Sequence, residues 1–168
     1  TELGNGQKAQ VEFVSANPTG PLTVGHGRGA ILGDVISNIL EWNGYKVERE
    51  YYYNNAGRQM RMLGKSVYAR YMELLGSALK IPEGGYEGKY IKEIAQQVLD
   101  EHGESLIKDK ENPIFKESAE SYIFNDITKT LDKIGIHFDT FFNENTLYKN
   151  NEINNVIEEL KTKKLVYE

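Results

Sequence analysis

Residues 11–34, VEFVSANPTGPLTVGHGRGAILGD, constrain the fold more than any other stretch of the chain. Residues 11–16 favour a strand, because valine and phenylalanine suit a pleated surface. The segment Asn17–Pro21 continues neither a strand nor a helix, since its prolines lack a backbone donor and its glycine relaxes φ. Helical spacing of apolar residues begins after Val24. The stretch therefore predicts a strand, a tight turn and a helix, in that order.

The same alternation is predicted to continue along the chain. The first helix ends near Gly44, and a second strand follows over residues 45–53. A turn over residues 54–57 leads into a second helix that ends at Gly76. Such a β-α-β-α unit has parallel strands and a right-handed crossover. The apolar stripes of the two helices are Leu32, Val35, Ile36, Ile39 and Leu40, then Met60, Leu63, Val67, Tyr71, Leu74 and Leu75.

The second half of the chain predicts more helix and another strand. Loops are expected over 77–88 and 104–113, helices over 90–103, 114–135 and 151–164, and strands over 136–143 and from Val166 onward. The helical faces predicted to pack inward are Ile91, Ile94, Ala95 and Val98, then Ile123, Ile127, Leu131 and Ile134, and last Ile153, Val156, Ile157 and Leu160. Leu106 and Ile107 are expected to dock on the core from their loop.

These elements predict an α/β fold with a parallel sheet flanked by helices. In such sheets ligands bind outside the carboxyl ends of the strands, where the turns 17–26 and 54–58 lie. A helix N-terminus binds anions, phosphates included. Glycines at 25, 27 and 29 leave the backbone open to a flat ligand, and His26 supplies a hydrogen-bond donor. The pattern indicates a nucleotide phosphate site, although glycine-rich turns of this kind serve many ligands.

The same stretch closely resembles the first signature of arginyl-tRNA synthetases, V-E-F-V-S-A-N-P-T-G-P-L-H-x-G-H. Its core here is Ala16, Asn17, Pro18, Thr19, Gly20, Pro21, Leu22, Thr23, Val24, Gly25 and His26. Three further segments are similar to family segments in the same order: EYYYNNAG at 50–57, SVYARYMELLG at 66–76 and LVYE at 165–168. The resemblance covers nearly all of the chain, and the long first motif is highly specific.

The resemblance implies a Rossmann-like nucleotide-binding fold, the incomplete first half of a class I synthetase catalytic domain. Residues 1–168 would form a single domain, with a helical and loop insertion at about 77–113. The chain begins with Thr1 and ends within a predicted strand, so we expect a piece of a longer chain. A small complete protein is the alternative.

The activity that the resemblance implies is that of an arginine–tRNA ligase. Such an enzyme activates arginine with ATP, which Mg²⁺ accompanies, and transfers the arginyl group to tRNA(Arg). His26 and Thr23 take catalytic roles at the phosphates, and Gly25 and Gly29 join them in binding ATP. For Gly25 a helix-start glycine is the alternative, and for His26 a structural histidine. Catalysis of this kind depends on positioning and charge stabilisation more than on a general base.

Thr23 departs from the family pattern, which has histidine there. A threonine hydroxyl still donates a hydrogen bond but carries no charge, a difference of about 1 kcal/mol. Related adenylyltransferases often have T-x-G-H. We therefore interpret Thr23 as a natural variant rather than a sign of an inactive enzyme.

Arginine binding requires a carboxylate, because a planar guanidinium pairs best with two oxygens. By the family pattern Glu12 faces the guanidinium, while Ser15 and Asn17 hold the α-amino and carboxylate groups. A solvent-facing strand residue is the alternative for Glu12, and an Asx turn for Asn17. The second turn departs more from the pattern: Asn55 replaces the family's aspartate, and Arg58 follows Gly57. A turn without a substrate role fits Asn55 at least as well.

Composition narrows the class of protein further. The chain has 20 basic and 25 acidic residues, a net charge of −5, and its acidic excess lies in the second half. Bulk charge there does not attract nucleic acid. With no cysteine and three scattered histidines, neither a disulfide nor a metal site is expected. No apolar run is long enough to span a membrane. We expect a cytoplasmic monomer.

Three functions remain open at this point. The first is part of an arginine–tRNA ligase, which acts on arginine, ATP and tRNA(Arg). The second is another adenylyltransferase with an H/T-x-G-H signature and a small substrate, which has no need of an acid at Glu12. The third is a non-catalytic tRNA-binding module, which the acidic charge disfavours.

Overall fold

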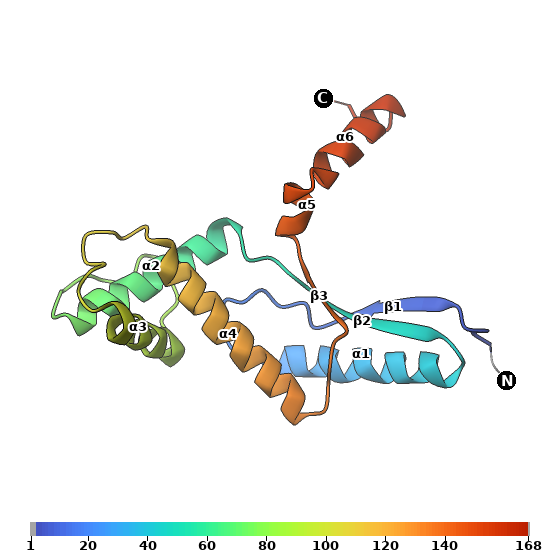
Figure 1. Cartoon of the computed structure of the whole chain (residues 1–168), viewed down its shortest axis with the longest axis horizontal. Coiled ribbons are helices and arrows are strands. Elements are labelled where there is room, and N and C mark those ends of the chain that lie inside the picture. The colour runs from blue at the N-terminus through green and yellow to red at the C-terminus, as the bar shows by residue number, and fades with distance from the viewer. Residues whose placement is uncertain (1–2, 168) are drawn as a thin grey trace.

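The computed structural model describes residues 3–167. In that part of the chain, three parallel strands form one sheet in the order β1-β2-β3, as the sequence predicts. The strands are β1 (Lys8–Glu12), β2 (Lys46–Tyr53) and β3 (Thr140–Asn143). Figure 1 shows them near the centre of the molecule, with their carboxyl ends directed toward a group of helices.

β1 begins earlier and ends earlier than the prediction of a strand over 11–16. It pairs with β2 from Lys8, opposite Lys46, to Glu12, opposite Glu50. Beyond Glu12 the backbone leaves the sheet, because Val14 and Ser15 have φ values of 64° and 45°. β-branched valine rarely takes such a conformation, and propensity alone extends the strand too far.

α1 (Val24–Trp42) covers one face of the sheet and starts where the sequence predicts. Its buried residues are Ala30, Gly33 and Ser37. A Cβ on Gly33 would lie 2.2 Å from the ring of Phe13, so only glycine allows this close approach of helix and strand. The predicted apolar stripe of this helix instead faces largely outward: Leu32, Val35, Ile36 and Ile39 are exposed.

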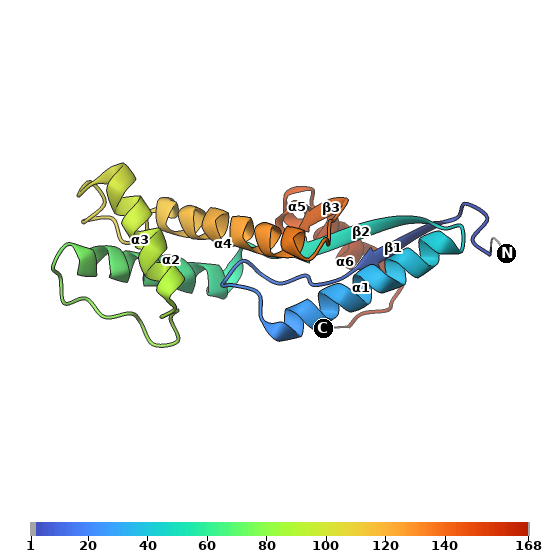
Figure 2. The same cartoon turned by 90° about the horizontal axis from the view of Figure 1, so that it is seen from below.

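The helices α2 (Gly57–Leu74), α3 (Lys89–His102) and α4 (Pro113–Lys133) pack on one another beyond the carboxyl ends of the strands (Figures 1 and 2). α4 also reaches back to the sheet, where Phe124 contacts Tyr51 and Tyr53. The core positions confirmed as buried are Met60, Leu63, Val67, Tyr71, Ile91, Ile94, Ala95, Val98, Leu106, Ile123, Ile127 and Leu131. Ile134 is exposed, so its prediction is wrong.

The last part of the described chain differs most from expectation. β3 is shorter than the predicted strand over 136–143, and the short helix α5 (Asn145–Lys149) follows it. α6 (Glu152–Thr162) projects away from the rest of the molecule and has no buried residue (Figure 1). Its predicted inward face is therefore wrong. Residues 165–167 form no strand, and Glu168 lies outside the described residues.

No helix within residues 3–167 combines the length and the apolar character that crossing a bilayer requires. Apolar residues of α1, among them Ile31, Leu32 and Val35, line an open cavity on the surface of this helix.

This exposed face predicts that the 168-residue chain binds a hydrophobic dye such as ANS. The double variant Ile31→Glu, Val35→Lys removes two exposed apolar side chains and adds a favourable i,i+4 pair. We expect its ANS fluorescence to fall about twofold or more, with little change in melting temperature. Ile157→Lys, an exposed position on α6, is the control and should change the fluorescence less. Unchanged fluorescence in the double variant would contradict this assignment.

Candidate functional site

The chain turns sharply where β1 ends. Phe13 N–H donates to the carbonyl of Glu50 at 3.2 Å, and the N–H of Ser15 then donates back to the carbonyl of Phe13 at 2.9 Å. Val14, between them, has a positive φ. Strained backbone of this kind persists where surrounding structure holds it, and it is concentrated at functional sites. The turn redirects the chain from the sheet into the segment Asn17–Pro21, which we call the signature loop.

Ser15 has a structural hydrogen bond at this turn. Its Oγ accepts the backbone N–H of Tyr52 at 3.1 Å and lies 3.4 Å from the carbonyl oxygen of Phe13. The hydroxyl thus replaces a missing strand-to-strand bond where β1 has left the sheet.

Asn17 joins the two loops that the sequence predicts at the carboxyl end of the sheet. Its Oδ1 accepts the N–H of Asn54 at 2.9 Å, and its Nδ2 donates to Oε1 of Gln59 at 3.2 Å. The backbone N–H of Thr19 donates to the Asn17 carbonyl at 2.7 Å. Asn17 therefore fixes the start of the signature loop against the second turn and the start of α2.

Thr23 and His26 cap the N-terminus of α1 reciprocally. The backbone N–H of Thr23 donates to Nδ1 of His26 at 3.0 Å, and the N–H of His26 donates to Oγ1 of Thr23 at 3.4 Å. Because Nδ1 accepts a hydrogen bond, the neutral imidazole carries its proton on Nε2. His26 thus offers an N–H donor on the ring nitrogen that the cap does not use.

The glycines at this helix start leave space beside the backbone. A Cβ on Gly27 or Gly29 would meet no atom within 4 Å, and one on Gly25 would only touch Oγ1 of Thr23 at 3.5 Å. Packing within the chain therefore does not explain these three glycines. Their arrangement is compatible with a ligand that lies against the helix.

Glu12 lies on the other face of the sheet from α1. Residues alternate along a strand, and Phe13 faces α1, so Glu12 points to the free face, where it is exposed. Tyr52 lies on the same face. Burial and the hydrogen bond from its hydroxyl to Glu144, at 2.9 Å, raise the pKa of Tyr52 to about 12, and the charge of Glu12 contributes. Glu12 and His26 thus occupy different faces at the same end of the sheet.

The second turn uses both asparagines to contact other elements. Asn54 Nδ2 donates to Glu144 at 2.6 Å, and Asn55 Nδ2 donates to Oε1 of Glu120 on α4 at 2.7 Å. The Oδ1 of Asn55 is buried without a hydrogen-bond partner. An aspartate here would bring two carboxylates together, which explains physically why the amide suits this chain. The turn interpretation of Asn55 fits these contacts.

Two residues that sequence reasoning missed hold this region. Glu144, after β3, accepts hydrogen bonds from Tyr52 and Asn54, and Tyr90 of α3 donates its hydroxyl hydrogen to the carbonyl of Thr19 at 2.8 Å. Neither residue belongs to a sequence motif that could have identified it. Only the fold brings them to the loops, from 90 and 71 residues away.

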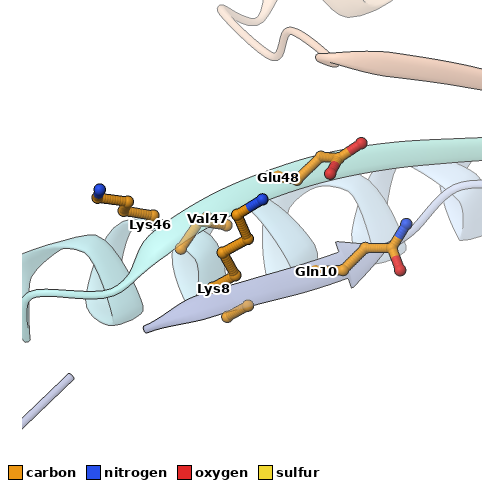
Figure 3. Close-up of a pocket in the computed structure, with 6 residues that line it drawn as sticks. Lys8, Gln10, Lys46, Val47 and Glu48 are labelled. Atoms are coloured by element: carbon orange, nitrogen blue, oxygen red, sulfur yellow. The ribbon is translucent and has the colours of Figure 1, made fainter. Parts of the chain in front are cut away.

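A cavity at the opposite end of the sheet is a weaker candidate. It is lined by Lys8, Ala9, Gln10, Lys46, Val47 and Glu48, and Figure 3 shows these side chains around the amino ends of β1 and β2. Ligands of parallel sheets bind beyond the carboxyl ends of the strands. The loop region around the signature loop therefore remains the better candidate.

A parallel sheet with a glycine-rich helix N-terminus beyond the carboxyl ends of its strands is typical of nucleotide-binding α/β domains. The chain matches the model of one family over residues 1–168, tRNA synthetases class I (R), catalytic domain. The domain is thus that of a class I aminoacyl-tRNA synthetase. Within this class, the chain belongs to the arginyl-tRNA synthetase family.

Curated relatives are similar over all or most of the chain. An arginine–tRNA ligase of Desulfotalea psychrophila is 56% identical over 168 residues, which are 100% of this chain and 30% of that protein. An arginine–tRNA ligase of Chlorobaculum parvum is 57% identical over 90% of this chain and 28% of its own length. The chain thus spans about 30% of the length of the curated relatives that it matches.

Solved structures share the fold. A candidate arginyl-tRNA synthetase of Campylobacter jejuni superposes with a TM-score of 0.86 and 33% identity, over 98% of this chain and 37% of that chain. The arginyl-tRNA synthetase of Thermus thermophilus, at 21% identity and a TM-score of 0.65, has the same fold over 95% of this chain and 27% of its own.

The contact of Asn55 with Glu120 predicts the effect of restoring the family's aspartate. Asn55→Asp should lower the free energy of unfolding by about 1–3 kcal/mol at pH 7, because two carboxylates then meet in a half-buried site. The loss should shrink near pH 4 as the carboxyls protonate. Urea unfolding at both pH values measures it, with the exposed Asn125→Asp on α4 as control. Equal losses in both variants would refute the contact.

Proposed function

We propose that this chain is the first part of the catalytic domain of an arginine–tRNA ligase. The complete enzyme activates arginine with ATP and transfers the arginyl group to tRNA(Arg). The observation that carries the proposal is the identity of 56% with a curated arginine–tRNA ligase over the entire chain. Because the chain spans about 30% of that relative, we expect the 168 residues alone to be inactive.

The cap of α1 supports a role in holding the ATP phosphates. His26 donates from Nε2 to phosphate oxygens, where negative charge builds during attack by the arginine carboxylate. Thr23 orients this imidazole and adds a hydroxyl, while Gly25 and Gly29 admit the nucleotide against the backbone. A Mg²⁺ ion would accompany the nucleotide and offset the charge of its phosphates.

The end of β1 supports a role in binding arginine. The exposed carboxylate of Glu12 pairs with the guanidinium, while Asn17 and Ser15 lie in the turn that follows. The hydrogen bonds of Asn17 and Ser15 within the chain are compatible with this role, since an amide has further donor and acceptor capacity and a hydroxyl bonds more than one partner. These bonds hold both side chains in place before the substrate binds.

The complete enzyme that contains this chain tests the function directly. We expect ATP–pyrophosphate exchange that depends on arginine and charging of tRNA(Arg). Exchange that depends on a small phosphate ester instead of arginine would favour another adenylyltransferase. Salt-dependent tRNA binding without any exchange would favour a non-catalytic module and contradict the proposal.

The role of Glu12 predicts a selective defect. Glu12→Gln in the complete enzyme should raise the KM for arginine about tenfold or more, because the guanidinium then meets one neutral amide oxygen in place of a carboxylate with two. The KM for ATP should change less than twofold. Glu48→Gln is the matched control, since Glu48 lies on the same face of the sheet, opposite Gln10 rather than Glu12, and accepts a hydrogen bond from the hydroxyl of Thr140 at 2.7 Å. Equal changes in both KM values for Glu12→Gln would count against a role in recognising arginine.

A further inference from the structure

We propose that Tyr90, on α3, is a positioning residue that holds the signature loop in its productive conformation. This inference rests on the proposed function, because the loop precedes the Thr23–His26 cap and contains Asn17. It assigns a role in the reaction to a residue of the 77–113 segment, which the sequence ties least to the sheet.

The contact between Tyr90 and the loop is close and specific. The Tyr90 hydroxyl donates to the carbonyl of Thr19 at 2.8 Å. A Cβ on Gly20 would lie 3.0 Å from the hydroxyl oxygen and 3.4 Å from Cζ, so a glycine there lets the ring lie against the loop backbone. A Cβ on Gly88 would come within 2.3 Å of the same ring. Glycines on both sides thus make room for this tyrosine.

The position of Tyr90 is set by helix α3, which is anchored by buried residues. The neighbouring Ile91 is fully buried, as are Ile94, Ala95 and Val98 of the same helix. α3 packs through these residues into the helical group, so the hydroxyl of Tyr90 has a defined position. Tyr90 therefore connects the loop to the core of α2, α3 and α4 rather than to a mobile surface.

A second tyrosine holds the residue immediately before the loop. The hydroxyl of Tyr51, on β2, donates to the carbonyl of Ala16 at 2.8 Å, and burial raises the pKa of Tyr51 to about 12. The carbonyls of Ala16 and Thr19 are thus held by tyrosines from the sheet and from the helical group. The orientation of the loop depends on both layers together.

Beyond the ring of Tyr90, the far end of the loop at Pro21 borders open space. A cavity lies there, lined by Pro21, Lys89, Tyr90, Glu93, Tyr122, Ile123 and Asp126. The hydrogen bond to Thr19 therefore restrains the loop next to this open space. Pro18 and Pro21 stiffen the segment, so a displacement at Thr19 is transmitted to Asn17 and to the cap at Thr23.

Tyr68 provides a matched control for Tyr90. Its hydroxyl donates to the carbonyl of Ile107 at 2.7 Å, within the same helical group rather than to the signature loop. Tyr90→Phe and Tyr68→Phe each remove one half-buried hydroxyl that binds one carbonyl. Their losses of stability should be similar, so melting temperature alone does not distinguish positioning from packing.

The kinetic test uses the complete enzyme. We expect Tyr90→Phe to lower kcat/KM for arginine in ATP–pyrophosphate exchange about tenfold, with both a lower kcat and a higher KM, since small misplacements of reacting groups have large effects. Tyr68→Phe should stay within about twofold of the unsubstituted enzyme. A Tyr90→Phe enzyme within twofold of the unsubstituted one, or an equal fall in Tyr68→Phe, would overturn the proposal.

Hydrogen exchange gives a second readout that is independent of activity. Tyr90→Phe should speed amide exchange in a peptide that covers residues 17–26, and Tyr68→Phe should not. Unchanged exchange in Tyr90→Phe would overturn the positioning role. If the unsubstituted enzyme lacks arginine-dependent exchange of pyrophosphate, the proposed function fails, whereas the hydrogen-exchange comparison still decides whether Tyr90 restrains the loop.

Discussion

The packing of Phe13 on Gly33 is the contact on which the candidate site depends. It brings α1 as close to β1 as a glycine allows. The ring of Phe13 also lies 4.5 Å from that of Phe138, which precedes β3. One aromatic side chain thus fixes the helix, the first strand and the approach to the third strand relative to one another. The N-terminus of α1, with His26, is thereby placed at the carboxyl end of the sheet.

The candidate site lies between the parallel sheet and the group of helices α2, α3 and α4. The sheet contributes Glu12 and the turn at Ser15, and the helical group contributes Tyr90 and the partner of Asn55. A change in the packing of α3 therefore reaches the signature loop through Tyr90, and a change in the packing of α4 reaches the second turn through Glu120. Side-chain hydrogen bonds connect the loops at the end of the sheet to the helices: Asn17 to Gln59, Asn55 to Glu120 and Tyr90 to Thr19. Such bonds respond individually to substitution, which makes the site sensitive to conservative changes.

Periodicity in the sequence identified the helices better than it identified their buried faces. The stripe that includes Leu32 and Val35 predicted α1 correctly, yet the helix packs through Ala30, Gly33 and Ser37. A helix that packs closely on a sheet needs small residues at the contact. A search for large apolar residues at helical spacing does not identify such positions. In α2, α3 and α4 large apolar residues do form the contact, and there the prediction of buried residues was accurate except at Ile134, which is exposed.

Sequence reasoning could not predict the turn after β1 or the hydrogen bond from Tyr90 to Thr19. Val14 adopts a positive φ against its own propensity, because the N–H of Ser15 bonds back to Phe13 and that of Tyr52 bonds to Ser15. The bond from Tyr90 to Thr19 depends on the packing of a separate helix. Both features arise from tertiary structure, whereas the signature itself could be identified from its residues alone.

Thr23 illustrates how a departure from the family pattern fits the local structure. Threonine is a favourable N-cap residue. In this position its backbone and hydroxyl both bond to His26 and so select the tautomer with a proton on Nε2. A donor on the far side of the imidazole is what a phosphate oxygen requires. The substitution therefore removes one of the two histidine donors of the signature while the cap orients the other, which supports the interpretation of Thr23 as a functional variant of the signature.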